Sequence, residues 1–360
     1  MLFVSSSLSG GGAERYVSNV LGALDRQRFA PELCLFRREI DYPLPDDVRL
    51  ELVPKPGPLG IAPAVWRLAR LIDRRRPQLV VSAFSSPSFV TGNALPLAQH
   101  RPRWLARVSS DPDESEPGRL LRHWMGRLYA RADSVVANAH YLCERVAQVH
   151  APPAGVEYLP NATDFAAIDR GAEEAAPAPP SGRLRLISVG RLEPLKRFDL
   201  LLEAGAQLLE RFEFELVILG EGRERARLES RAQELGLRLV LPGFCTNPWA
   251  WLARADLFVL PSATEGLPNA LVEAQGLGLA AVVSGGPATG AVEVVQDGAT
   301  GRIVPQGDAT ALASALSELL GDAPTRHAFA ARARERARAQ YALEPAARAL
   351  EAQLDELCRR

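Results

Sequence analysis

Cysteine and net charge are both scarce in this sequence, and each shortage excludes a class of protein. The four cysteines stand far apart, with no C-x-x-C pair and no histidine at metal-ligand spacing, so we expect neither a disulfide framework nor a zinc site. The 42 lysines and arginines are balanced by 43 acidic residues, which leaves no basic excess for nucleic acid. We therefore expect reduced thiols, a cytoplasmic protein and no nucleic-acid partner.

Long apolar runs are missing as well. The N-terminus has no basic region, and its apolar run is too short for a signal peptide. The longest uncharged windows, residues 77–99 and 274–292, are broken by glycine, serine or proline. Neither window therefore predicts a transmembrane helix.

The chain does contain an alternation of short apolar runs and longer helical patterns, which is typical of parallel sheets. Its 360 residues, 47% of them hydrophobic, suffice for two domains. In the first half the expected strands are residues 2–5, 32–36, 79–84 and 134–138. In the second half they are residues 184–189, 215–219, 237–241, 257–260 and 280–284. The pattern predicts an α/β protein of two doubly wound, Rossmann-like domains that face a central cleft.

The alternation pauses once, and this pause gives the expected domain boundary. Residues 171–182 are rich in Ala, Pro and Glu and have nothing to bury. We expect an N-terminal domain over residues 1–170, a linker at 171–182, a C-terminal domain over 183–340 and a terminal segment at 341–360. The segment from Thr325 onward predicts two helices interrupted at Glu344 and Pro345, the second of them crossing back to the N-terminal domain.

Ligands of such sheets bind beyond the carboxyl ends of the strands, so the strand-to-helix turns are where binding residues are expected. The first turn has glycines at residues 10–12, which let a backbone and helix amides approach a ligand. The dinucleotide fingerprint G-x-G-x-x-G fails here because Arg15 replaces its third glycine. The alternative is a tight turn that serves packing alone.

The turn after residues 184–189 is basic. Arg191 and Lys196 can converge there on a diphosphate, because a guanidinium fork and a point charge complement each other. Only Lys55 and Lys196 are lysines among the 42 basic residues, which draws attention to the latter. The alternative is a solvated basic turn. A third turn, with Gly220 and Gly222, again lacks the last glycine of the fingerprint and is weak evidence alone.

The fourth turn, at residues 257–274, is the richest in candidate groups. Pro268 fits the first position of a helix, so nearby amides would lie at the positive end of its dipole, ready for an anion. Glu265 lies before that helix, and Glu273 lies about 7.5 Å along its axis. A diphosphate flanked by two carboxylates suits a nucleotide sugar, because carboxylates accept hydrogen bonds from paired hydroxyls. In the alternative reading Glu265 caps the helix and Glu273 is a surface residue.

The segments GGGAER, SVGRLEPLKRFDLLLEA, LVILGEGRERARLE, LPGFCTNPWAWLARADLFVLPSATEGLPNALVEA and DGATGRIVPQGD together resemble the retaining glycosyltransferases of family 4, which have the GT-B fold. The resemblance spans residues 10–308, and the E-x7-E pair of Glu265 and Glu273 is its most specific element. It implies that Arg191 and Lys196 bind the diphosphate, Glu273 the ribose, and Glu265 with two amides the sugar. The implied donor-binding set is Gly12, Gly190, Arg191, Lys196, Gly220, Gly222, Phe244, Glu265, Gly266, Leu267, Asn269 and Glu273.

The resemblance also implies the chemistry, which is transfer of a sugar with retention, without a metal or cofactor, from a UDP- or GDP-linked donor. Arg191 and Lys196 would stabilise charge on the leaving diphosphate. A histidine that many members carry near the anomeric centre is absent here, so Asp111 or Ser110 takes its place in our interpretation. Asp111, Glu265, Arg191 and Lys196 form the expected catalytic set. A second departure is the stretched turn that ends at Glu293.

The acceptor implied by the resemblance is a glycan or a lipid-linked sugar, as in bacterial cell-surface polysaccharide synthesis. The basic amphipathic stretch that begins at Arg119 and ends at Arg131 would suit an anionic membrane at the inner face, or would pack as an ordinary helix. Alternative functions are a nucleotide-sugar epimerase of the same fold and a non-catalytic sugar-nucleotide binder. A nicotinamide oxidoreductase is disfavoured because both glycine-rich turns miss their third glycine.

Overall fold

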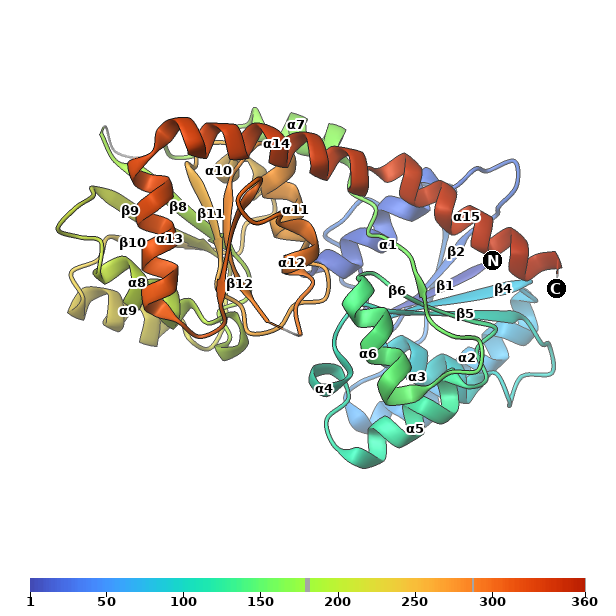
Figure 1. Cartoon of the computed structure of the whole chain (residues 1–360). Helices are drawn as coiled ribbons and strands as arrows, with labels where there is room; N and C mark the ends of the chain where they lie inside the picture. The colour runs from blue at the N-terminus through green and yellow to red at the C-terminus, as the bar shows by residue number, and fades with distance from the viewer. Residues whose placement is uncertain (179–181, 287, 360) are drawn as a thin grey trace. The chain divides into compact units, whose positions relative to one another are not determined.

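The computed structural model describes residues 1–178, 182–286 and 288–359, which form two compact units. One unit comprises Met1–Ala162 together with the C-terminal segment from Leu343, and the other comprises Thr163–Ala342. Each unit is a parallel sheet covered by helices on both faces (Figure 1). The predicted fold class, two doubly wound α/β domains, is thereby confirmed.

The sheet of the N-terminal unit has the strand order β3-β2-β1-β4-β5-β6-β7. The order reverses between β1 and β4, as in doubly wound sheets. All its neighbouring strands run parallel. The strands are β1 (Leu2–Ser5), β2 (Glu32–Leu35), β3 (Arg49–Leu52), β4 (Leu79–Ala83), β5 (Arg103–Val108), β6 (Ser134–Ala137) and β7 (Glu157–Tyr158).

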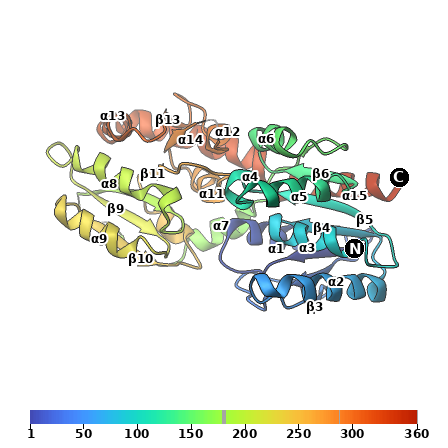
Figure 2. The same ribbon diagram turned by 90° about the horizontal axis from the view of Figure 1, so that it is seen from below.

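Two helices cover one face of this sheet, and four cover the other (Figure 1, Figure 2). The first pair is α1 (Gly12–Ala23) and α15 (Leu343–Arg359), which lie side by side. The second group is α2 (Ile61–Arg75), α3 (Ser85–Ala94), α5 (Arg119–Tyr129) and α6 (His140–His150). Short turns complete the unit: η1 (Pro58–Gly60) before α2, and α4 (Pro112–Ser115) after β5.

The sheet of the C-terminal unit has the order β10-β9-β8-β11-β12-β13, again entirely parallel. Its strands are β8 (Leu184–Val189), β9 (Phe214–Leu219), β10 (Leu239–Gly243), β11 (Leu257–Leu260), β12 (Ala281–Gly285) and β13 (Gly301–Pro305). Side chains alternate between two buried clusters, because successive strand residues point to opposite faces.

The helices of this unit pack on those two clusters. On one face lie α8 (Phe198–Ala206), α9 (Arg225–Glu234) and α13 (Ala309–Gly321). On the other lie α7 (Phe165–Ala172), α10 (Trp249–Leu252), α11 (Asn269–Gly276) and α12 (Ala291–Val294). The long helix α14 (Ala323–Tyr341) contributes Phe329 to the first cluster and Ala337 to the second.

The division between the units lies before α7, whereas the sequence predicted it after residue 170. Phe165 and Ile168 of α7 are buried in the core of the C-terminal unit. The Asp169 carboxylate pairs with Arg338 of α14, which further ties α7 to that unit. Residues 171 and 172, expected in the linker, end α7, and residues 179–181 of that expected linker lie outside the described residues.

The C-terminal helices are interrupted at Ala342, not at the predicted Glu344 and Pro345. Ala342 has an extended backbone with ψ of 149° and separates α14 from α15. Pro345 lies in the first turn of α15, where a missing N–H breaks no hydrogen bond. Helix α15 buries Leu350 and Leu354 in the cluster that α1 shares.

Candidate functional site

Except for Gly12 of the N-terminal unit, the residues predicted to bind a donor gather at one edge of the C-terminal sheet. They lie in the loops that follow β8, β9, β10 and β11 or in α11, and these four strands are neighbours in the order β10-β9-β8-β11. Because the strands are parallel, their carboxyl ends meet at the same edge. The strand order thus brings together loops that are far apart in the sequence.

The basic turn after β8 meets the turn after β11 through an ion pair. The Nζ atom of Lys196 lies 2.6 Å from Oε1 of Glu265, and the two side chains are only 18% and 11% exposed. Lys196 ends the short helix η2 (Pro194–Lys196), and Arg197 follows with φ of 51°, which turns the chain into α8. The Ala263 amide donates to the carbonyl of Leu195 at 2.9 Å and holds the two turns together.

Arg191 differs from Lys196, although both stand in the same turn. Its side chain is exposed, and its guanidinium has no hydrogen bond or ion pair within the described part of the chain. A guanidinium in this state can bind an anion without first breaking a contact. Of the two residues predicted to bind the diphosphate, Lys196 is therefore already ion-paired and Arg191 is available to bind an anion.

The glycines of this edge have a packing reason that is independent of any ligand. A Cβ atom at Gly220, where φ is +150°, would lie 2.0 Å from the carbonyl oxygen of Gly190. A Cβ atom at Gly222 would lie 2.3 Å from the carbonyl oxygen of Leu192. The Gly190 amide donates to Leu219 at 2.9 Å, so the loops after β8 and β9 are in close backbone contact.

Glu273 is buried inside α11, so the alternative reading of a surface residue is wrong. Glu273 is only 4% exposed, and its Oε2 atom accepts a hydrogen bond from Trp249 Nε1 at 2.8 Å. Pro268 is the N-cap of α11, not its first residue as the sequence predicted, because its ψ of 100° is extended. The N-cap position is therefore held by Pro268 and not by Glu265, and the N-cap residue itself makes no side-chain cap hydrogen bond.

The remaining donor candidates differ in what they can offer a ligand. Phe244, just after β10, is 51% exposed and presents a ring at the sheet edge. Leu267 is 5% exposed and lies in the core cluster, so only its backbone is suited to ligand contact. Gly266 precedes it in the turn, and Asn269 is the first residue of α11.

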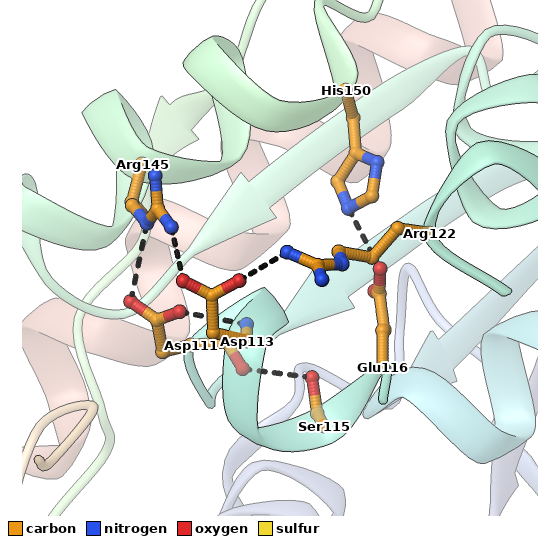
Figure 3. A network of polar contacts seen from close by, with 7 residues as sticks. All are labelled: Asp111, Asp113, Ser115, Glu116, Arg122, Arg145 and His150. Atoms are coloured by element: carbon orange, nitrogen blue, oxygen red, sulfur yellow. Dashed lines mark hydrogen bonds and ion pairs between the residues drawn. The ribbon is translucent and has the colours of Figure 1, made fainter. Parts of the chain in front are cut away.

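In the N-terminal unit, Gly12 is the first residue of α1, with Gly11 as its N-cap. Asp111 is buried and has structural partners (Figure 3). Its Oδ1 accepts from the amide of Asp113 at 2.8 Å, and its Oδ2 lies 3.6 Å from Nε of Arg145. The Asp111 carboxylate already caps α4, and its catalytic role stays a prediction.

Sequence reasoning missed two buried polar groups of the N-terminal unit. Arg107 of β5 is 1% exposed, and its guanidinium lies 3.7 Å from the centre of the Tyr16 ring. Burial lowers the pKa of Arg107 and raises that of Tyr16. The signal in the sequence that could have revealed Arg107 is a single arginine inside the apolar run WLARV. The second group is His150, whose Nε2 lies 2.9 Å from Oε2 of Glu116 (Figure 3).

Helix α5, for which the sequence left open a membrane-facing role or ordinary packing, is buried on one side and exposed on the other. Met125, Leu128 and Tyr129 are buried, whereas Leu120 is 83% exposed and Trp124 is 50% exposed. Among the described residues, no helix has both the length and the apolar content to cross a membrane. Within the same residues, no group of three or more His, Cys, Asp or Glu side chains is arranged to hold a metal ion.

Comparisons with known proteins match this chain along most of its length. A family model described as "Glycosyltransferase Family 4" matches residues 10–167, and one described as "Glycosyl transferases group 1" matches residues 169–336. A relative from Campylobacter jejuni is 27% identical over 92% of this chain and 93% of its own. Its name is N-acetylgalactosamine-N,N'-diacetylbacillosaminyl-diphospho-undecaprenol 4-alpha-N-acetylgalactosaminyltransferase.

Two solved structures share the fold. Anabaena HepE in complex with UDP and glucose has a TM-score of 0.83 at 19% identity, over 99% of both chains. Sucrose-phosphate synthase from Thermosynechococcus elongatus has a TM-score of 0.84 at 20% identity, over 99% of this chain and 98% of its own. This chain therefore shares the fold of these solved structures.

Proposed function

The chain belongs to the GT-B glycosyltransferases of family 4, and from this membership we propose that it transfers a sugar, with retention, from a nucleoside diphosphate sugar to a hydroxyl of a glycan or lipid-linked acceptor. The ion pair of Lys196 and Glu265 carries the proposal. It joins a cation suited to phosphate and a carboxylate suited to sugar hydroxyls at one sheet edge. The relatives are named as glycosyltransferases, and these names favour neither an epimerase nor a non-catalytic sugar-nucleotide binder.

We propose that positive charge from this chain assists departure of the nucleoside diphosphate. Arg191 is exposed and unengaged, so it can bind the diphosphate as soon as the donor arrives. Lys196 shares its charge with Glu265 until negative charge from the donor competes for the ammonium group. Charge that grows on the leaving oxygen is then stabilised by donors already in place, which lowers the barrier to transfer. Amides near the start of α11 add to this effect.

Two features support the proposed donor and stereochemistry. The C. jejuni relative is named as an α-transferase, and the HepE structure holds UDP and glucose. We propose a UDP- or GDP-linked donor, with the ribose held by Glu273 and the base near the exposed ring of Phe244. The reaction proceeds without a metal or cofactor in this proposal, so a chelator is expected to leave turnover unchanged.

A donor panel tests the proposal. The purified chain is incubated with UDP-, GDP- and ADP-sugars, and release of the nucleoside diphosphate is measured with and without glycan or lipid-linked acceptors. We expect turnover with one base, insensitivity to EDTA, and an α-linkage by NMR when the donor sugar is α-linked. Arg191→Ala and Lys196→Ala serve as the matched controls. Failure of every donor to bind or react would refute the assignment of the donor site.

We further propose that the acceptor side of the enzyme works at an anionic membrane surface. Leu120 and Trp124 of α5 are exposed, and so are Arg119 and Arg127 of the same helix. Apolar side chains flanked by arginines suit the headgroup region of anionic lipids. The relative that acts on an undecaprenol diphosphate sugar agrees with a lipid-linked acceptor.

Vesicle flotation tests this part separately. We expect the chain to float with phosphatidylglycerol vesicles and not with pure phosphatidylcholine. The double variant Leu120→Ala/Trp124→Ala should lose flotation, and Leu209→Ala, which removes a 40% exposed leucine of the C-terminal unit, should retain it. Equal flotation of both variants would refute the role of α5.

A further inference from the structure

The buried carboxylate of Glu273 accepts a hydrogen bond from the side chain of Trp249. In the described part of the chain, the Trp249 Nε1 atom donates to Oε2 of Glu273 at 2.8 Å. Glu273 is 4% exposed, so its carboxylate meets little water. Trp249 opens α10 and Glu273 lies in the middle of α11, so the bond connects two elements of the C-terminal unit.

The indole ring is itself held in place from a third element. The Trp249 amide donates to Oδ1 of Asn247 at 3.1 Å, and Nδ2 of Asn247 donates to the carbonyl of Gly171 at 2.8 Å. Gly171 lies in the last turn of α7, where a Cβ atom would come within 2.4 Å of Cε3 of the indole. The ring therefore packs against backbone, and its N–H direction is set by α7 as well as by α10.

A fixed donor restricts how the Glu273 carboxylate can rotate. The terminal torsion of a glutamate is soft, and an unrestrained carboxylate samples a broad range of orientations. A hydrogen bond to one oxygen defines the plane of the group and so the directions in which its lone pairs point. Paired ribose hydroxyls need acceptors in a defined direction, and ordering them in advance avoids an entropy loss at binding.

We propose that Trp249 is a positioning residue that orients Glu273 toward the ribose hydroxyls of the donor, so that the site selects ribonucleotides over deoxyribonucleotides. This inference rests on the proposed function, because it takes Glu273 to be the ribose ligand. A site built to bond a hydroxyl discriminates against an analogue that lacks it, since the acceptor is then left without its partner. Trp249 acts through Glu273 and touches no reacting atom.

The test compares binding of UDP with binding of 2′-deoxy-UDP and 3′-deoxy-UDP by titration calorimetry, or the same set for GDP if the donor panel selects guanine. Wild type is expected to prefer the ribonucleotide over at least one deoxy analogue by ten-fold or more. Trp249→Phe keeps the ring against Gly171 and removes the N–H donor. We expect it to weaken UDP binding roughly ten-fold and to leave binding of that deoxy analogue within about two-fold, so that discrimination is nearly lost.

Two further variants separate positioning from structure. Trp251→Phe changes the other tryptophan of α10, which lies beside Arg185, and should keep full discrimination. Glu273→Gln should lose discrimination by itself, and adding Trp249→Phe to it should cause no further loss. This cycle stays informative even if Trp249→Phe lowers the melting temperature.

The outcomes distinguish this inference from the proposed function. Equal weakening of ribo- and deoxyribonucleotides in Trp249→Phe would overturn the inference, because it would indicate a purely structural tryptophan. Unchanged discrimination in that variant would overturn it as well. Absence of any nucleotide binding by the wild-type chain would overturn the proposed function itself, and the inference with it.

Discussion

Breaking the ion pair between Lys196 and Glu265 should cost both stability and turnover, in proportions that the structure predicts. The atoms lie 2.6 Å apart, and the side chains are 18% and 11% exposed. Exposed ion pairs contribute about 0.2–1 kcal/mol, whereas removing one partner of a fully buried pair costs about 3–5 kcal/mol. For this partly buried pair, we expect Lys196→Ala to lower the free energy of unfolding by about 2 kcal/mol.

A double-mutant cycle isolates the pair. Lys196→Ala leaves the Glu265 carboxylate without this cation, whereas Lys196→Ala/Glu265→Gln removes both charges. The double variant should therefore be less destabilised than the sum of the single variants, by about 1 kcal/mol. The assay is thermal and urea unfolding, and for a unit of this size 2 kcal/mol corresponds to a melting temperature lower by about 4–8 °C.

Turnover provides the second readout. Loss of one donor that stabilises a developing negative charge lowers kcat by about 10²–10³-fold, so Lys196→Ala should fall in that range. Arg191→Ala is the matched control, because its exposed side chain has no partner within the described residues. It should change stability by less than about 0.5 kcal/mol and still reduce turnover. If the losses in free energy of unfolding of the two single variants simply add in the double variant, the ion pair makes no contribution to stability. Retained turnover in Lys196→Ala with native-like melting would remove that lysine from the mechanism.

Three further predictions concern packing and stability. Gly220→Ala places a Cβ atom 2.0 Å from a carbonyl oxygen, so we expect loss of nucleotide binding by calorimetry, whereas Gly321→Ala, whose Cβ atom would lie no nearer than 3.7 Å to Phe212, should bind normally. His150→Ala leaves the 1% exposed Glu116 side chain unpaired and should lower the free energy of unfolding by about 3 kcal/mol in urea; a change below about 1 kcal/mol would contradict this. Leu350→Ala should lower the free energy of unfolding of the N-terminal unit by about 3 kcal/mol while nucleotide binding persists. Loss of nucleotide binding together with this stability would contradict the prediction.

Hydrophobic pattern predicted the fold class and several strands to the residue. The expected strands at 184–189 and 257–260 coincide with β8 and β11, because both are apolar runs bounded by polar turns. The pattern missed β3, β5, β7 and β13. Strand β3 is half-exposed, β5 contains two arginines, β7 has only two residues, and β13 mixes glycine and proline with its apolar residues, so none gives a clear period.

The domain boundary shows where local pattern misleads. Residues 171–182 look like a linker by composition, yet the division lies before α7. Gly171 belongs to α7 because an indole ring and an asparagine side chain, both more than 70 residues away, pack against it. The composition of a segment indicates whether its own side chains can form a buried core. It contains no information on which distant segments pack against it.

The sequence by itself determined two parallel-sheet domains, the position of the turns at their carboxyl edges, and the residue types in those turns. Only the tertiary structure decided that Lys196 meets Glu265, 69 residues away, and that Trp249 holds Glu273. The physical reason is strand order. Periodicity fixes which residues of a strand are buried, but the neighbours of a loop depend on how nonconsecutive strands pair, and that is set by packing of the whole sheet.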